Sequence, residues 1–144
     1  IRRILRFADI RPGETICDLG CGDGRVLITS AKEFFTRAIG VEIDPIKVVI
    51  ARLLARINGV SDRVQIVRGN MFDFDPGSAD VLYLYLTHQA MDRLFPEILK
   101  KLKPSVRIVS YRFCLRGMTP DKVSEDKTLF LYQLDKGTKI NTYH

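Results

Sequence analysis

A glycine-rich segment, Asp18-Leu-Gly-Cys-Gly-Asp-Gly24, holds the residues of this sequence best suited to bind a ligand. Glycines let the backbone turn sharply and approach a ligand, and the helix predicted directly after them offers free N–H groups. The dinucleotide fingerprint G-x-G-x-x-G would need glycine at position 25, which is Arg. The Asp18 carboxylate would repel a pyrophosphate and attract an ammonium group. We therefore interpret this segment as a binding loop for a ligand with an amino group; the alternative is a strained turn in which Asp18 only caps a helix.

Two later segments carry groups suited to a nucleoside. Glu42 ends a predicted strand, where its carboxylate could accept hydrogen bonds from both hydroxyls of a ribose. Asp44 competes for this role, but it precedes Pro45 and is better suited to helix capping. Asn70 follows the next predicted strand. Its side-chain amide, together with the Met71 N–H, could read an adenine edge between apolar side chains. The residues expected around the adenine are Asn70, Met71, Phe72 and Ile43.

Strands and helices are predicted to alternate around these residues. Apolar runs predict strands over residues 15–19, 38–43, 64–68, 80–86, 106–113 and 128–134, with a candidate short strand over 121–125. Helical periodicity predicts helices over residues 1–8, 25–35, 46–57 and 89–102, the last with a kink or a restart at Pro96. This order implies a mainly parallel sheet covered on both faces. Ligands of such sheets bind beyond the carboxyl ends of the strands, where the strand order reverses.

Length and composition agree with one globular α/β domain over residues 1–144. The chain is 46% hydrophobic and 28% charged, and no apolar run approaches the roughly 20 residues of a membrane span. Because the chain begins at Ile1 inside a predicted helix, we expect an amino-terminal segment to precede it.

The charge and the cysteine content indicate which partners and which cellular compartment to expect. The net charge of +6 suits an acidic partner, a nucleic acid or an anionic cofactor. The 3 cysteines and 2 histidines support neither a disulfide framework nor a metal site. We therefore expect a cytoplasmic protein with free thiols and no metal, and we expect it to be a monomer.

The glycine loop, the acid and the amide, in this order, resemble the class I S-adenosylmethionine-dependent methyltransferases. The resemblance implies that the loop and Asp18 hold the methionine part of S-adenosylmethionine, Glu42 the ribose, and Asn70 and Met71 the adenine. It also implies a three-layer, doubly wound α/β fold with a seven-stranded, mainly parallel sheet of order 3-2-1-4-5-7-6 and an antiparallel last strand.

Further segments, such as Leu99-Lys-Lys-Leu-Lys-Pro104 and Arg107-Ile-Val-Ser-Tyr-Arg-Phe113, are similar to a narrower group. This group comprises the compact archaeal broad-specificity protein lysine methyltransferases and their mitochondrial relatives. Enzymes that methylate base amines carry Asn or Asp-Pro-Pro-Tyr/Phe after the fourth strand, where this sequence has Tyr85-Leu-Thr-His88. Because that motif is missing, nucleic acid is disfavoured as a partner, and the resemblance favours protein substrates with exposed lysines. Family members also have a Tyr/Pro/Thr-rich amino-terminal segment, and this segment is absent here.

The resemblance predicts that Tyr85, Thr87 and Tyr111 orient the lysine amine, and His88 is expected to start a helix. In the fifth strand, predicted over residues 106–113, Tyr111 and Phe113 share one face and Arg112 lies on the other, so only one set can face the site. The predicted function is transfer of a methyl group from S-adenosylmethionine to lysine side chains of proteins. The alternatives are a methyltransferase of the same fold acting on RNA or small molecules, and a nucleotide-binding module without catalysis.

Overall fold

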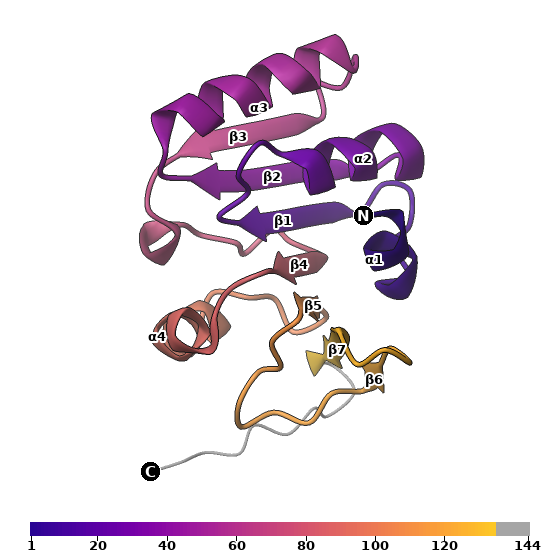
Figure 1. Ribbon diagram of the computed structural model, residues 1–144, viewed down its shortest axis with the longest axis vertical. Coiled ribbons are helices and arrows are strands. Elements are labelled where there is room, and N and C mark those ends of the chain that lie inside the picture. The colour runs from indigo at the N-terminus through magenta and orange to yellow at the C-terminus, as the bar shows by residue number, and fades with distance from the viewer. Residues whose placement is uncertain (135–144) are drawn as a thin grey trace.

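Seven strands form a single sheet in the order β3-β2-β1-β4-β5-β7-β6 (Figure 1). The computed structural model describes residues 1–134 of the chain. The first five strands run parallel, and β7 is antiparallel to both of its neighbours, which confirms the predicted sheet. The strands are β1 Thr15–Leu19, β2 Arg37–Glu42, β3 Val64–Arg68, β4 Val81–Leu84, β5 Arg107–Tyr111, β6 Lys122–Val123 and β7 Leu129–Gln133.

Helices cover both faces of the sheet, but unequally. The elements are α1 Arg2–Phe7, α2 Arg25–Phe34, α3 Pro45–Ile57, α4 His88–Leu99 and a 3-10 turn, η1 Met71–Asp73. Buried residues of α1, α2 and α3 belong to one hydrophobic cluster, and those of α4 belong to the cluster on the other face. Cys17 and Cys21 lie in different clusters, so the sheet separates their thiols.

Local signals explain where α3 and α4 begin. The Asp44 side chain accepts a hydrogen bond from the Ile46 N–H at 2.9 Å, and Pro45 is the first helical residue, so the predicted capping role of Asp44 is confirmed. His88 starts α4, as predicted. The helix continues through Pro96 without a restart because Leu94 and Ile98, each 2% exposed, hold this turn in the core.

Two strands end earlier than the apolar runs that predicted them. β4 ends at Leu84, which places Tyr85 in the loop at the carboxyl edge of the sheet, and β5 ends at Tyr111. Within residues 1–134, none of the helices is long and apolar enough to cross a bilayer, and no group of three side chains is arranged to hold a metal ion. His144 lies outside the described residues.

Candidate active site

The glycine loop between β1 and α2 forms the floor of the site. Gly20, Gly22 and Gly24 all have positive φ, at 76°, 59° and 79°, so side chains at these positions would strain the backbone. Backbone N–H groups of Gly20 and Cys21 donate to the carbonyl oxygen of Val41 at 2.9 and 3.0 Å, which fixes the loop against β2. The loop therefore has one defined shape.

Glu42, at the end of β2, ties this loop to the next strand. Its Oε1 accepts a hydrogen bond from Gly22 N–H at 2.8 Å, and its Oε2 accepts one from Asp44 N–H at 3.0 Å. The residue is buried, with 8% of its surface exposed. Because a carboxylate oxygen can accept two hydrogen bonds, each oxygen retains capacity for a ligand hydroxyl.

Asp18 is a buried carboxylate without a hydrogen-bond partner among residues 1–134. The residue is 5% exposed and lines a cavity of about 710 Å³. Burial, and secondly the negative charge of Glu42, raise the pKa of Asp18 well above its usual value. Because burial disfavours the charged carboxylate, a positive group bound in this cavity would stabilise it.

A second cavity, of about 310 Å³, adjoins the first at Gly20, which lines both. All four residues predicted around the adenine, and Glu42, line this second cavity, which confirms that the chain brings them together. The Asn70 side-chain oxygen accepts a hydrogen bond from Phe72 N–H at 2.9 Å and so caps η1, and the residue also lines this cavity. The four residues predicted around the adenine are Ile43, Asn70, Met71 and Phe72.

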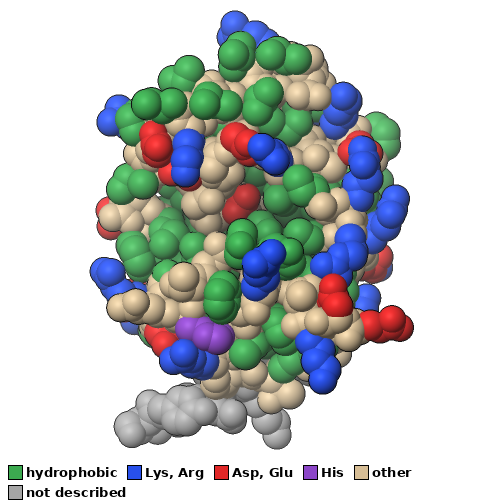
Figure 2. Space-filling model, viewed as in Figure 1, with side chains coloured by type: hydrophobic (Ala, Val, Ile, Leu, Met, Phe, Trp, Pro, Cys, Tyr) green, Lys and Arg blue, Asp and Glu red, His purple; other side chains and the backbone are tan. Residues whose placement is uncertain are grey.

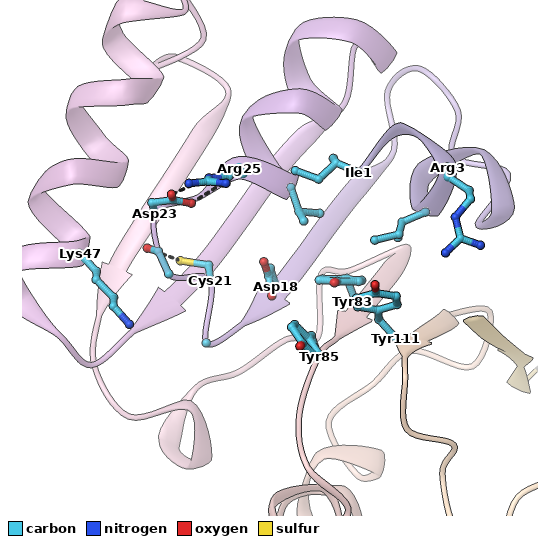
Figure 3. A pocket seen from close by; sticks show the side chains of 14 residues that line it. Ile1, Arg3, Asp18, Cys21, Asp23, Arg25, Lys47, Tyr83, Tyr85 and Tyr111 are labelled. Atoms are coloured by element: carbon cyan, nitrogen blue, oxygen red, sulfur yellow. Dashed lines mark hydrogen bonds and ion pairs between the residues drawn. The ribbon is translucent and has the colours of Figure 1, made fainter. Parts of the chain in front are cut away.

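Three tyrosines form the opposite wall of the larger cavity: Tyr83, Tyr85 and Tyr111. Figure 3 shows their rings grouped beside Asp18, with Lys47 and the Asp23–Arg25 pair across the cavity. The rings of Tyr85 and Tyr111 meet edge to face, with centroids 5.0 Å apart. This wall offers aromatic faces and phenol groups to a second ligand next to the one held by the loop.

Residues 18–122 match the ANTKMT methyltransferase domain. The chain belongs to this family. A protein-lysine N-methyltransferase of Saccharolobus islandicus is 38% identical over 92% of this chain and 86% of its own length. A lysine N-methyltransferase of Xenopus laevis, named for a component of ATP synthase, is 25% identical over 98% of this chain and 62% of its own length.

A solved structure with the same fold is an RNA methyltransferase from Salinibacter ruber in complex with S-adenosyl-L-homocysteine. The two structures superpose with a TM-score of 0.89 at 34% identity. The match covers 92% of the present chain and 88% of the Salinibacter ruber chain. The predicted methyltransferase fold is thus confirmed.

The structure does not place Thr87 with the tyrosines of the methyltransferase. Its hydroxyl accepts a hydrogen bond from Ala90 N–H at 3.2 Å and caps α4, and Thr87 lines neither cavity. Tyr83, in contrast, was not predicted as a site residue from the sequence, since it lies within the apolar run that predicted the strand over residues 80–86. It is in register with Asp18 and 5% exposed, and burial, and secondly the Asp18 charge, raise its pKa. The two-residue period from Tyr85 was the signal that could have identified it.

Other lining residues had no clear signal in the sequence. Ile1, Arg3 and Ile4 line the larger cavity from the amino end of the chain, and Val26 and Lys47 line it from α2 and α3. Asp23 and Arg25 form an ion pair at 2.7 Å at the start of α2, and both also line it. Cys21, which was predicted as part of the cofactor-binding loop, also lines this cavity; burial, then the charges of Asp18 and Glu42, raise the pKa of its thiol to about 12.

The expectation that Tyr111 and Phe113 share one face is wrong. Arg112 has a φ of 70°, in the left-handed region, which ends β5 and breaks the alternation of side chains. Phe113 consequently packs against the α4 cluster, with its ring 5.1 Å from that of His88. The Arg112 guanidinium instead lies over the rings of Tyr111 and Tyr85, at 5.2 and 5.9 Å from their centroids.

Proposed function

We propose that this chain transfers a methyl group from S-adenosylmethionine to lysine side chains of proteins. The observation that carries the proposal is Asp18, a buried carboxylate without a hydrogen-bond partner in the described chain, beside a wall of tyrosines. Its relatives in Saccharolobus and Xenopus are both named as lysine N-methyltransferases, which supports a protein substrate.

The residues present fit the cofactor. Its α-ammonium group would pair with the unpartnered carboxylate of Asp18, and its ribose hydroxyls would donate to the remaining acceptor positions of Glu42. The adenine would occupy the smaller, largely apolar cavity, and the methionine part would continue past Gly20 into the larger one. When bound, the cofactor supplies an electrophilic methyl group on a sulfonium.

The larger cavity has the groups that a lysine acceptor needs. Tyr85 and Tyr111 present ring faces that favour an approaching ammonium group, and the buried Tyr83 brings a phenol beside Asp18. A free lysine amine has a pKa of about 10.4 and is neutral in roughly one molecule in 2,500 at pH 7, a gap of about 4.6 kcal/mol. Partial desolvation between the tyrosines would lower the amine pKa and reduce this gap.

A methyltransferase for RNA is the second candidate, because the Salinibacter ruber relative bears that name and this chain has a net charge of +6. A monomeric state and a cytoplasmic location stay predictions.

One labelling experiment separates the two candidates. The protein is incubated with methyl-labelled cofactor and a mixture of acidic proteins and RNA, and the protein and RNA fractions are counted. We expect label in the protein fraction and, by mass spectrometry, added masses of about 14 Da, one methylene, on lysines. The rate should rise from pH 7 to 9 as more acceptor amine becomes neutral. Label found only in RNA would refute the lysine proposal and favour the second candidate.

A further inference from the structure

Arg112 occupies an unusual position against two of the tyrosines, Tyr85 and Tyr111, that line the larger cavity. Its backbone N–H is fixed by a 2.6 Å hydrogen bond to the carbonyl oxygen of Thr128, and its φ is 70°. Few residues other than glycine adopt this conformation. The conformation carries the guanidinium over Tyr85 and Tyr111, whereas regular strand alternation would place it on the other face of β5. A strained residue at a site is a reason to look for a role in that site.

The charge around Arg112 differs from that around Arg3 and Arg25, the two arginines that line the cavity. Arg25 is paired with Asp23 at 2.7 Å, and Arg3 is paired with Asp126 at 3.0 Å. Arg112 has no carboxylate partner within residues 1–134, and its side chain is exposed. A cation without a carboxylate partner therefore lies beside the two tyrosines that are proposed to orient the lysine substrate, itself a cation in solution.

This arrangement repels an isolated lysine but favours one that arrives with a negative charge beside it. A guanidinium presents paired N–H donors that match a carboxylate in a bidentate geometry. Stacked on two rings, the Arg112 side chain is also held in position, so that fewer of its conformations are lost when a carboxylate binds.

We propose that Arg112 determines substrate specificity by binding an Asp or Glu side chain that lies next to the target lysine in the protein substrate. The inference rests on the proposed lysine acceptor and adds a sequence preference to it. The carboxylate neutralises the guanidinium while the lysine enters the cavity beside Tyr85 and Tyr111, so recognition of the neighbour and admission of the amine occur together.

Matched peptides test this inference. Two peptides with a single lysine differ only in having Glu or Gln at the residues flanking it, and kcat/KM is measured for both at low salt. We expect the unaltered enzyme to prefer the Glu peptide by about tenfold, as for a charged hydrogen bond of about 1.4 kcal/mol. This preference should shrink as salt is added.

Variants assign the preference to Arg112. In Arg112→Ala, and in Arg112→Gly, whose new residue suits a positive φ, the ratio of the two rates should fall to about one. Arg116→Ala is the matched control, because it removes the same charge from an exposed pair with Asp92 outside the cavity, and it should keep the tenfold ratio.

Equal kcat/KM values for the Glu and Gln peptides with the unaltered enzyme would overturn the inference. A tenfold preference for the Glu peptide that survives in both Arg112 variants would also overturn it. Either result would leave the proposed lysine acceptor intact. Absence of label from both peptides would overturn the lysine acceptor and the inference with it.

Discussion

The proposed role of Asp18 in ligand binding has a cost for the stability of the cofactor-free protein. Because burial raises its pKa, the folded state favours the neutral carboxyl group more than the unfolded state does. The stability that this group contributes is present below its unfolded pKa of about 3.9 and is lost as the pH rises through the folded value. At neutral pH the folded, cofactor-free protein therefore bears an unfavourable term, which an ammonium group would remove.

We predict that Asp18→Asn stabilises the cofactor-free protein and weakens cofactor binding. At pH 7 its free energy of unfolding should rise, because the amide carries no charge for burial to penalise. The affinity for S-adenosylmethionine should fall at least tenfold, because a charge-assisted hydrogen bond is worth about 1.5 to 3 kcal/mol. Thermal unfolding and titration calorimetry measure the two effects. Asp92→Asn, in the exposed pair with Arg116 outside both cavities, is the control for net charge, and unchanged affinity in Asp18→Asn would contradict the assignment.

For single residues, the positions that could be predicted from the sequence were those fixed by local backbone geometry. The glycine loop and Glu42 are recognisable because their positions follow from the turn between β1 and α2 and from the end of β2. The position of Arg112 depends on its bond to Thr128, a pairing between β5 and the residue before β7, which no local pattern reveals. Thr87 is similar, since its hydroxyl could serve a site or a helix cap, and only the structure shows that it caps α4.

Among the elements, α3 shows where hydrophobic periodicity stops being informative. The sequence placed this helix correctly, yet apolar residues lie on both of its faces. Its buried face packs on the sheet, whereas its outer face exposes a row of aliphatic side chains, seen where hydrophobic side chains gather at the top of Figure 2. The exposed members are Ile46, Val49, Ile50, Leu53 and Ile57. Periodicity identified the helix but could not decide which apolar stripe is buried.

Two adjacent valines of α3 give a matched test of its orientation. Val48 is 2% exposed and Val49 is 64% exposed. Val48→Ala should lower the free energy of unfolding by about 2 kcal/mol, because it removes two buried methyl groups and leaves a cavity. Val49→Ala should change it by less than about 0.5 kcal/mol, since the side chain is in water in both states. Urea denaturation at equilibrium measures both, and equal losses would show that the assigned inner face of α3 is wrong.

For the whole molecule, the strand order was predictable, but the way in which the first helix joins the site was not. Alternating strands and helices, together with the family resemblance, were sufficient for the order of the sheet. The attachment of α1 depends on Arg107 of β5, which is far away in the sequence. Its guanidinium donates to both carboxylate oxygens of Glu14, at 2.8 and 2.7 Å, and to the carbonyl oxygens of Ala8 and Asp9, each at 3.2 Å.

Arg107 should therefore stabilise both the fold and the larger cavity, to which α1 contributes Arg3 and Ile4. The side chains of Arg107 and Glu14 are only 17% and 19% exposed, so removal of the guanidinium leaves a largely buried carboxylate unpaired. We expect Arg107→Ala to lose about 3 kcal/mol of stability in urea denaturation, the lower end of the range for breaking a buried ion pair. The exposed pair of Arg116 with Asp92 is the comparison, and Arg116→Ala should lose less than about 1 kcal/mol.

The same substitution should also weaken cofactor binding, because α1 and the turn after it are released from β5 next to the cavity. Calorimetry with S-adenosylmethionine, at a temperature where the variant remains folded, should show a clear drop in affinity for Arg107→Ala and none for Arg116→Ala. If Arg107→Ala loses stability but binds the cofactor as well as the unaltered protein does, the position of α1 matters for folding alone. That result would indicate that Arg3 and Ile4, although they line the larger cavity, do not contribute to cofactor binding.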